Sequence, residues 1–329
     1  MTQGNGRLVY FNGKMVPESE ARLSIYDSAL MFGDMVFEMT RSFNNKQFKL
    51  TEHIERLYVG LKILRVELEM TPSQMEDAVH QTIEANAPCF EDDDEHRILI
   101  DVSRGLLGMY QDIAGIDKGP NVIIADFPLR WTVSGMGHLF DSGINAVIPS
   151  QRALRGDMLD PKIKNRSRIH YLQANIQVSQ FAGDDNWALL LDPDGFIAEG
   201  TGYNFFLVKG DVLFTPEGRN ILRGISRGFV MEELAPRLGL GVEECNLEPY
   251  DVHTADEAFV TATPFCMLPV TSLDGLPLGN GKVGPVYSRL LAAWGEDVGV
   301  DIAAQIQVWD GKNKKKTKTP SKPTAYRFK

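Results

Sequence analysis

Residues 187–216 read WALLLDPDGFIAEGTGYNFFLVKGDVLFTP and contain two hairpins in succession. In the first, a run of aliphatic residues is followed by Pro193-Asp194-Gly195 and then by FIAE. In the second, YNFFLV and VLFTP lie on either side of Lys209-Gly210-Asp211. Short apolar runs separated by such turn residues are typical of antiparallel strands. The stretch therefore predicts that this half of the chain is built on a β-sheet.

Further strands and helices are predicted on both sides of these hairpins. The strands are INAVIP (144–149) and EAFVTAT (257–263), and TSLDGLPL (271–278) forms a last hairpin. The helices are HYLQANIQVSQF (170–181) and the amphipathic stretch ISRGFVMEELAPRLGL (225–240). The second half of the chain is thus predicted to be rich in strands, with a few helices.

The first third of the chain alternates hairpins, helices and strands. Asn12-Gly13 and Asn44-Asn45 each lie between apolar runs and predict tight hairpin turns. Thr51 is predicted to cap a helix, and Thr71-Pro72 to open a second one with proline at its first position. Two strands are predicted after these helices: RILIDVSRG (97–105) and NVIIADF (121–127).

Changes in composition predict where the domains end. Periodicity is lost and Gly, Ser and Pro appear between Leu129 and Gly137, which indicates a linker. The last 18 residues, KNKKKTKTPSKPTAYRFK, hold eight of the 34 Lys and Arg and no acid, which predicts a disordered tail. The predicted organisation is a small N-terminal domain (1–128), a linker (129–137), a large C-terminal domain (138–311) and a basic tail (312–329).

The overall composition is that of a globular protein with an acidic body. The formal net charge is -10, and without the basic tail it is 26 minus 44, or -18. An acidic body argues against nucleic acid as a partner, because binding phosphates needs a basic face. The first residues, MTQGNGRLVYFNG, show no basic segment followed by an apolar core, and no apolar run is long enough to span a membrane, so we expect a cytoplasmic protein. The three cysteines are scattered, which predicts neither disulfides nor a metal site.

Several residues in the second half could bind an anion or a cationic ring. Glu199 ends a predicted strand and is followed by Gly200 and Gly202, which let the backbone approach a ligand; a solvated strand end is the alternative. Gly224 precedes Ile225-Ser226 at a helix start, where free N–H groups attract anions, unless Ser226 only caps the helix. Thr263 ends a strand and offers a hydroxyl to a phosphate or to the chain end.

The stretch LDPKIKNRSRIHYLQ (159–173) supplies candidate amine nucleophiles. Neighbouring cations favour the neutral, nucleophilic form of a lysine, and Lys164 is followed by Arg166 and Arg168. Lys162 is the second candidate in this stretch. A solvated surface lysine is the alternative for either of them.

A series of motifs, in order along the chain, resembles the class IV, fold type IV pyridoxal 5'-phosphate (PLP) enzymes. These motifs are IYDSALMFGDMVFEMTRSF, TEHIERL, LDPKIKNRSRI, LLDPDGFIAEGTGYNFFLV, LRGISRG, ADEAFVTAT and LPVTSLDG. The resemblance covers about residues 8–303. The family includes branched-chain and D-amino-acid aminotransferases and 4-amino-4-deoxychorismate lyase. It implies an α+β fold of two domains, a small N-terminal α/β sandwich and a larger barrel-like β domain with helices. It also implies a homodimer with its active sites near the interface.

The resemblance assigns roles to individual residues. Lys164 resembles the lysine that forms the aldimine with PLP, and Glu199 resembles the acid that pairs with the pyridine nitrogen. Four residues of this chain resemble those that bind the cofactor phosphate in the family: Arg56, Ile225, Ser226 and Thr263. The pyridinium then accepts the electrons released when the substrate loses its Cα proton, and the lysine moves that proton.

The substrate-binding residues of the family match less well. The Arg-x-His pair that grips the carboxylate in D-amino-acid aminotransferases is absent after the RG turn, and Tyr110 stands where amine transaminases have an arginine. Arg152 and Arg155, in the loop SQRALRGDM, are therefore predicted to bind the substrate carboxylate, with solvated loop arginines as the alternative. Phe32 and Phe37 match residues that line the substrate pocket, or else they pack in the core.

Three functions follow from the resemblance. The first is an aminotransferase, similar to the branched-chain enzymes, that moves an amino group between an amino acid or amine and a 2-oxo acid. The second is a lyase that releases pyruvate from an aminated chorismate, favoured locally by KNRSRI. The third is a homologue that binds PLP without catalysis, which the presence of both Lys164 and Glu199 disfavours.

Overall fold

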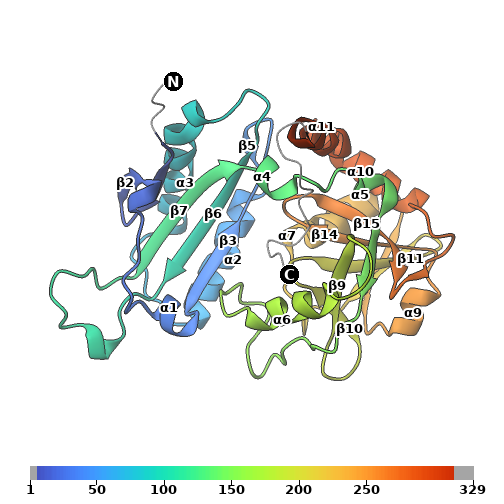
Figure 1. Ribbon diagram of the computed structural model, residues 1–329, viewed down its shortest axis with the longest axis horizontal. Helices are drawn as coiled ribbons and strands as arrows, with labels where there is room; N and C mark the ends of the chain where they lie inside the picture. The colour runs from blue at the N-terminus through green and yellow to red at the C-terminus, as the bar shows by residue number, and fades with distance from the viewer. Residues whose placement is uncertain (1–5, 315–329) are drawn as a thin grey trace. The chain divides into compact units, whose positions relative to one another are not determined.

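The computed structural model describes residues 6–314, which divide into two compact units (Figure 1). Unit 1 comprises the chain up to Trp131 together with Ile163–Arg168, and unit 2 comprises Thr132–Lys162 and the chain from Ile169 onward. The sequence places residues 163–168 in the C-terminal domain, but in the structure they cluster with unit 1 because they pair with its edge strand. The predicted linker is partly helical, since α4 spans Arg130–Val133.

Unit 1 is built on an antiparallel five-stranded sheet in the order β2-β1-β7-β6-β3. Figure 1 shows β3, β6 and β7 side by side. A separate two-stranded hairpin, β4-β5, follows β3. The strands are β1 (Leu8–Phe11), β2 (Lys14–Pro17), β3 (Met35–Met39), β4 (Ser42–Phe43), β5 (Lys46–Gln47), β6 (His96–Ser103) and β7 (Asn121–Pro128).

Two helices cover one face of this sheet. Apolar side chains of α2 (Leu50–Ile63) and α3 (Pro72–Asn86) pack on the alternate residues of β3, β6 and β7 that point to this face. The opening of α3 is as predicted, because the Thr71 hydroxyl and the Gln74 side chain form a capping box. The prediction for α2 is wrong: its N-cap is Lys49, in the left-handed conformation, and not Thr51.

The short helices of unit 1 connect these elements. They are α1 (Ser28–Phe32) and the 3-10 turns Glu18–Glu20, Ala87–Cys89 and Gly108–Tyr110. The hairpins predicted at Asn12-Gly13 and Asn44-Asn45 are confirmed, since all four residues have positive φ, as tight β-hairpin turns of this type require.

Unit 2 is built on a nine-stranded sheet that follows the order β10-β9-β8-β15-β14-β11-β12-β13, with β16 paired to β15. The Ile197 N–H donates to the Leu247 carbonyl oxygen at 2.7 Å, which joins β10 to the segment after β13, so the sheet curls on itself like a barrel. The strands are β8 (Ile144–Val147), β9 (Asn186–Leu191), β10 (Ile197–Gly200), β11 (Asn204–Lys209), β12 (Val212–Pro216), β13 (Gly241–Cys245), β14 (Glu257–Ala262), β15 (Cys266–Leu273) and β16 (Leu276–Pro277).

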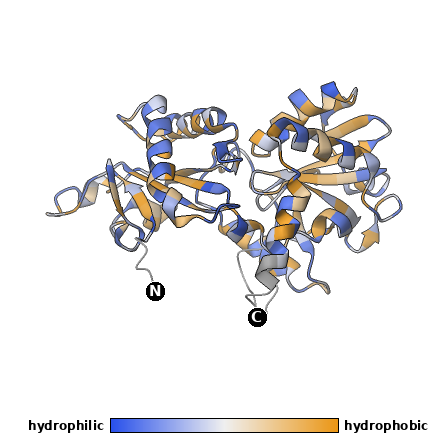
Figure 2. Ribbon diagram, turned by 90° about the horizontal axis from the view of Figure 1, so that it is seen from above, coloured by the Kyte–Doolittle hydropathy of each residue, from blue (hydrophilic) through white to orange (hydrophobic). Residues whose placement is uncertain are grey.

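The helices of unit 2 include the predicted stretch at 225–240, which forms α7, a π-helical turn at Val230–Leu234 and α8 in succession. In Figure 2 the strands of this unit are largely orange, the colour of hydrophobic residues, whereas blue hydrophilic residues gather in loops and on the outer sides of helices. The helices are α5 (Leu139–Ser142), α6 (Ile169–Val178), α7 (Ile225–Phe229), α8 (Ala235–Arg237), α9 (Pro249–His253), α10 (Pro285–Val298) and α11 (Ile302–Lys314).

The predicted basic tail lies mostly outside the described residues. Helix α11 continues to Lys314, so it includes the first three residues assigned to the tail, and residues 315–329 are not described. Between residues 6 and 314, no helix is both long and apolar enough to span a bilayer.

Candidate active site

The segment Ile163–Arg168 runs along the outer edge of β3, the last strand of the sheet in unit 1. The Phe37 N–H donates to the Lys164 carbonyl oxygen at 2.9 Å, and the Arg166 N–H donates to the Met35 carbonyl oxygen at 3.0 Å. These bonds satisfy polar groups that an edge strand otherwise exposes. The backbone of Lys164 is therefore held by the sheet, although the residue lies outside any helix or strand.

A close approach of Gly33 fixes the other end of this segment. Gly33 has a φ of +68°, and a Cβ built on it would lie 2.5 Å from the Ser167 hydroxyl oxygen. That hydroxyl donates to the Phe32 carbonyl oxygen at 2.9 Å. The glycine after α1 thus allows the chain to approach Ser167 closely.

The side chain of Lys164 lies on an aromatic ring beside two arginines. Its Nζ is 4.6 Å from the centroid of the Phe37 ring, and the guanidinium carbons of Arg166 and Arg168 are 3.9 Å and 5.0 Å from it. The ring faces of aromatic residues attract cations. Arg166 also donates to both oxygens of Asp101, at 2.8 and 3.0 Å, which neutralises one of the three charges. Phe37 is 2% exposed, because the three basic side chains cover its ring.

Arg56 lies on α2 and faces β3 on the helix side of the sheet. Its Nε and Nη2 donate to the two oxygens of Glu38, at 2.6 and 2.9 Å. Glu38 is fully buried, and it also contacts the ring of His53. Two of the predicted residues, Lys164 and Arg56, therefore contact neighbouring residues of β3, Phe37 and Glu38 respectively.

Glu199 is the last residue but one of β10 in unit 2 and is buried. One of its carboxylate oxygens accepts a hydrogen bond from the Tyr171 hydroxyl at 2.8 Å. The other accepts from the Asn204 side chain at 3.1 Å and from the Leu222 N–H at 3.0 Å. Three donors of this kind stabilise the ionised carboxylate and fix its orientation, so the structure excludes the solvated strand end considered for Glu199.

The predicted phosphate-binding residues of unit 2 lie at the start of α7 and at the end of β14. No side chain in the described part of the chain caps α7, whose N-cap is Gly224. A Cβ on Gly224 would lie 2.1 Å from the Asn204 side-chain oxygen, so only glycine brings the helix start this close to the residue that holds Glu199. Helix α7, which begins with Ile225 and Ser226, packs against β14, and Thr263 directly follows that strand.

The arrangement fits a ligand with an anionic group and a ring nitrogen. Ser226 is buried at an uncapped helix start, where free backbone N–H groups bind anions. Thr261 is opposite Asn204 in the sheet, and its buried hydroxyl has no hydrogen-bond partner among the described residues. A buried polar atom without a partner is uncommon in native proteins. The donors of unit 2 therefore fit PLP, whose pyridine nitrogen requires an acid and whose phosphate requires donors.

The structure distinguishes among the predicted substrate residues. Phe32 is 65% exposed at the end of α1, so the alternative of core packing is wrong for this residue. Tyr110 stacks with Tyr26 at 5.0 Å between ring centroids. In the loop of unit 2, Arg155 donates to both oxygens of Asp157 and Arg152 donates to the Pro149 carbonyl oxygen.

A residue that the sequence analysis missed is Arg97, on β6. It is 6% exposed, and its Nε and Nη1 have no hydrogen-bond partner among the described residues. Its Nη2 contacts the Met39 sulfur at 3.5 Å, and burial, followed by the charge of Arg41, lowers the pKa of Arg97 to about 9. The sequence signal for a buried polar site was an arginine near the start of the apolar strand HRILIDVS, together with Asp101 on the same face of that strand.

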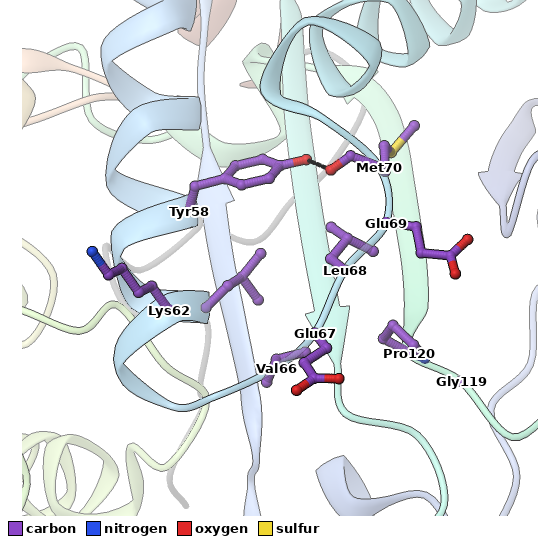
Figure 3. A pocket seen from close by; sticks show the side chains of 10 residues that line it. Tyr58, Lys62, Val66, Glu67, Leu68, Glu69, Met70, Gly119 and Pro120 are labelled. Carbon is purple, nitrogen blue, oxygen red and sulfur yellow. Dashed lines mark hydrogen bonds between the residues drawn. The ribbon is translucent and has the colours of Figure 1, made fainter.

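Unit 1 also has an open hollow of about 790 Å³ that none of the predicted site residues lines. Figure 3 shows Tyr58 of α2 pointing toward Met70, at the end of the stretch from Val66 to Met70 that lines the hollow. The Tyr58 hydroxyl donates to the Met70 carbonyl oxygen at 2.5 Å. The lining contains two separate acidic side chains and one lysine, which gives no constellation for acid-base or nucleophilic catalysis.

Comparisons with known proteins identify the family. The family model described as amino-transferase class IV matches residues 35–273, more than half of the chain. A putative branched-chain-amino-acid aminotransferase of Methanocaldococcus jannaschii is 36% identical over 283 residues, or 86% of this chain and 93% of that protein. A D-alanine aminotransferase of Bacillus licheniformis is 29% identical over 289 residues, or 87% of this chain and 95% of that protein.

A solved structure agrees with these sequence relatives. The branched-chain amino acid aminotransferase of Thermobaculum terrenum in its PLP form has a TM-score of 0.76 at 28% identity, over 93% of this chain and 98% of that chain. The predicted α+β fold of type IV and the predicted cofactor, PLP, are thereby confirmed. The roles of the individual site residues stay predictions. The chain belongs to the class IV aminotransferases, PLP-dependent enzymes that transfer amino groups.

Proposed function

We propose that Lys164 is the residue that binds PLP covalently in an amino-acid aminotransferase similar to the branched-chain enzymes. The observation that supports it most is the placement of its Nζ on the Phe37 ring beside Arg166 and Arg168. The neighbouring Lys162 is engaged differently, since its Nζ contacts Asp160 at 2.8 Å and donates to the Arg219 carbonyl oxygen. The positive charge of a neighbouring guanidinium favours the neutral form of an amine, whereas the Asp160 carboxylate beside Lys162 favours the charged form.

Each predicted residue then has a distinct task. When bound, PLP supplies an electron sink for the bond broken at the substrate Cα. The Lys164 Nζ would act as general base and acid, taking the proton from the substrate Cα and giving it back. Glu199, oriented by Tyr171 and Asn204, would pair with the pyridine nitrogen and favour its protonated form. Arg56 of unit 1 would donate to the phosphate, and so would Thr263, the Ser226 hydroxyl and the N–H groups of Ile225 and Ser226 of unit 2.

We further propose that Arg97, rather than the loop arginines, binds a carboxylate of the substrate. Phe37 and Met39 point to the same side of β3, about 7 Å apart, because a strand rises ~3.3 Å per residue. Lys164 contacts the first of them and Arg97 the second. A buried guanidinium with unpaired N–H groups requires an anion. A 2-oxo acid with a second carboxylate, such as 2-oxoglutarate, fits that spacing.

The activity test uses purified protein with PLP, one amino donor at a time and 2-oxoglutarate. We expect amino transfer from aliphatic amino acids, no transfer by Lys164→Ala, and retained transfer by the matched variant Lys162→Ala. Transfer that survives in Lys164→Ala would contradict the assignment. Release of pyruvate from 4-amino-4-deoxychorismate without amino transfer would establish the lyase instead.

We also propose that the enzyme is a cytoplasmic homodimer. Ile25, Leu30, Phe32 and Met109 are each more than half exposed, and they belong to neighbouring parts of unit 1, since Ser28 N–H donates to the Gly105 carbonyl oxygen. Contiguous exposed apolar groups mark protein contacts. Light scattering of Leu30→Ser/Phe32→Ser is expected to give a monomer where the wild type gives a dimer; an unchanged mass would refute the contact. The cysteines are all thiols, as in a reducing compartment.

A further inference from the structure

Glu38 is a buried carboxylate to which the predicted roles assign no task. It lies on β3, is 0% exposed and is held between two side chains of α2. Arg56 donates to its two oxygens from Nε and Nη2, and the His53 Nδ1 is 2.7 Å from one of them. A single carboxylate therefore organises two side chains that are one helical turn apart.

The charges in this group can be assigned. Burial raises the pKa of Glu38, but the charges of Arg56 and His53 and their hydrogen bonds outweigh it, so the pKa of that carboxyl lies well below its usual range. Burial lowers the pKa of His53 despite the opposing effect of Glu38. At neutral pH the group therefore consists of an ionised Glu38, a charged Arg56 and a neutral His53. Because a carboxylate only accepts hydrogen bonds, the single ring proton of His53 lies on Nδ1.

The geometry determines how the Arg56 guanidinium is oriented. Two parallel N–H bonds to one carboxylate fix the plane of a guanidinium, and the carboxylate itself is fixed by the third bond from His53. Arginine otherwise loses side-chain entropy when it is immobilised by a ligand. In this group the orientation is set before any ligand binds.

We propose that Glu38, oriented by His53, is a positioning residue that holds Arg56 in the conformation that receives the phosphate of PLP. The proposal rests on the proposed role of Arg56 in phosphate binding. It concerns affinity for the phosphate group and predicts no direct contact of Glu38 or His53 with the reacting atoms. Removing the charge from Glu38 would present an amide N–H to the donors of Arg56 or His53 and release the guanidinium.

The test compares the dissociation constants of the apoprotein for PLP and for pyridoxal, which lacks the phosphate. We expect Glu38→Gln to weaken PLP binding roughly tenfold, in line with the loss of a charge-assisted, preorganised contact, and to change pyridoxal binding less than about twofold. In an Arg56→Met background, Glu38→Gln is expected to change neither constant, because the group it positions is absent. His53→Gln keeps an N–H donor toward Glu38 and is expected to retain the wild-type ratio of the two constants.

The matched control is Asp34→Asn, which breaks another arginine–carboxylate pair of unit 1, with Arg104. It is expected to lower stability and leave the PLP to pyridoxal ratio unchanged. The proposal is overturned if Glu38→Gln weakens both ligands equally, if it tightens PLP, or if its effect persists in Arg56→Met. If the wild type binds neither PLP nor pyridoxal, the proposed function fails; if it binds PLP and Arg56→Met binds as tightly, only the role of Arg56 fails.

Discussion

Replacement of Arg97 by methionine is predicted to stabilise the apoprotein while impairing its reaction with dicarboxylic 2-oxo acids. The Arg97 guanidinium is buried, and two of its nitrogens have no hydrogen-bond partner among the described residues. None of the carboxylates in residues 6–314 forms an ion pair with it. Methionine has a similar length and fills the same space next to Met39 without a charge. The substitution therefore separates the effect of this side chain on stability from its proposed role in binding a substrate carboxylate.

The magnitude follows from the cost of burying the charge. A fall of the pKa from 12.5 to about 9 corresponds to roughly 5 kcal/mol, at about 1.36 kcal/mol for each pH unit. Relaxation and water penetration reduce such costs, and hydrophobic replacements of buried ions in other proteins have gained about 1–4 kcal/mol. We expect a gain in the lower half of that range, about 1–2 kcal/mol.

The assays are urea unfolding of the apoprotein and steady-state kinetics with 2-oxoglutarate and with a monocarboxylic 2-oxo acid. For Arg97→Met, we expect a higher free energy of unfolding and a KM for 2-oxoglutarate raised at least tenfold, with a much smaller change for the monocarboxylic acid. Arg104→Met is the matched control, because Arg104 pairs with Asp34 and donates to two backbone carbonyls, so its loss destabilises. An Arg97→Met apoprotein less stable than wild type, or an unchanged KM for 2-oxoglutarate, would refute the reasoning.

Two further substitutions test the start of α7 in unit 2 and the capping box of α3 in unit 1. Gly224→Ala is expected to weaken PLP binding at least tenfold, because its Cβ would lie 2.1 Å from the Asn204 oxygen and displace the start of α7 or the support of Glu199; fluorescence titration measures it, and wild-type affinity would contradict it. Thr71→Ala is expected to lower the free energy of unfolding by about 1 kcal/mol through loss of the capping box, with PLP affinity unchanged; a stability equal to wild type would show that the cap contributes nothing.

Local signals in the sequence were sufficient for most of the strands and turns. Asn12-Gly13 and Asn44-Asn45 are turn residues that adopt positive φ at low cost, so the residue types alone were enough to predict the hairpins. Thr71 could be recognised as a cap because Gln74 completes the box in the sequence itself. Thr51 could not be excluded in this way, because the start of α2 depends on the left-handed conformation of Lys49 after the β4-β5 hairpin.

The parts of the site that could not be predicted depend on contacts between distant segments. The pairing of residues 163–168 with β3 joins segments about 130 residues apart, so the sequence assigned them to the other domain. Tyr171 and Asn204 gain their roles only when α6, β10 and β11 bring them to Glu199. Arg97 was missed because whether an arginine in a strand is solvated or buried depends on what covers that face of the sheet.

Reduction of the holoenzyme with borohydride shows which lysine binds PLP, and thereby tests the proposed role of Lys164. The holoenzyme is treated with borohydride, which fixes PLP to the lysine that holds it, and the digested protein is analysed by mass spectrometry. We expect the phosphopyridoxyl group on Lys164 and none on Lys162, whose amine is paired with Asp160. A label on Lys162 or on any other lysine would contradict it.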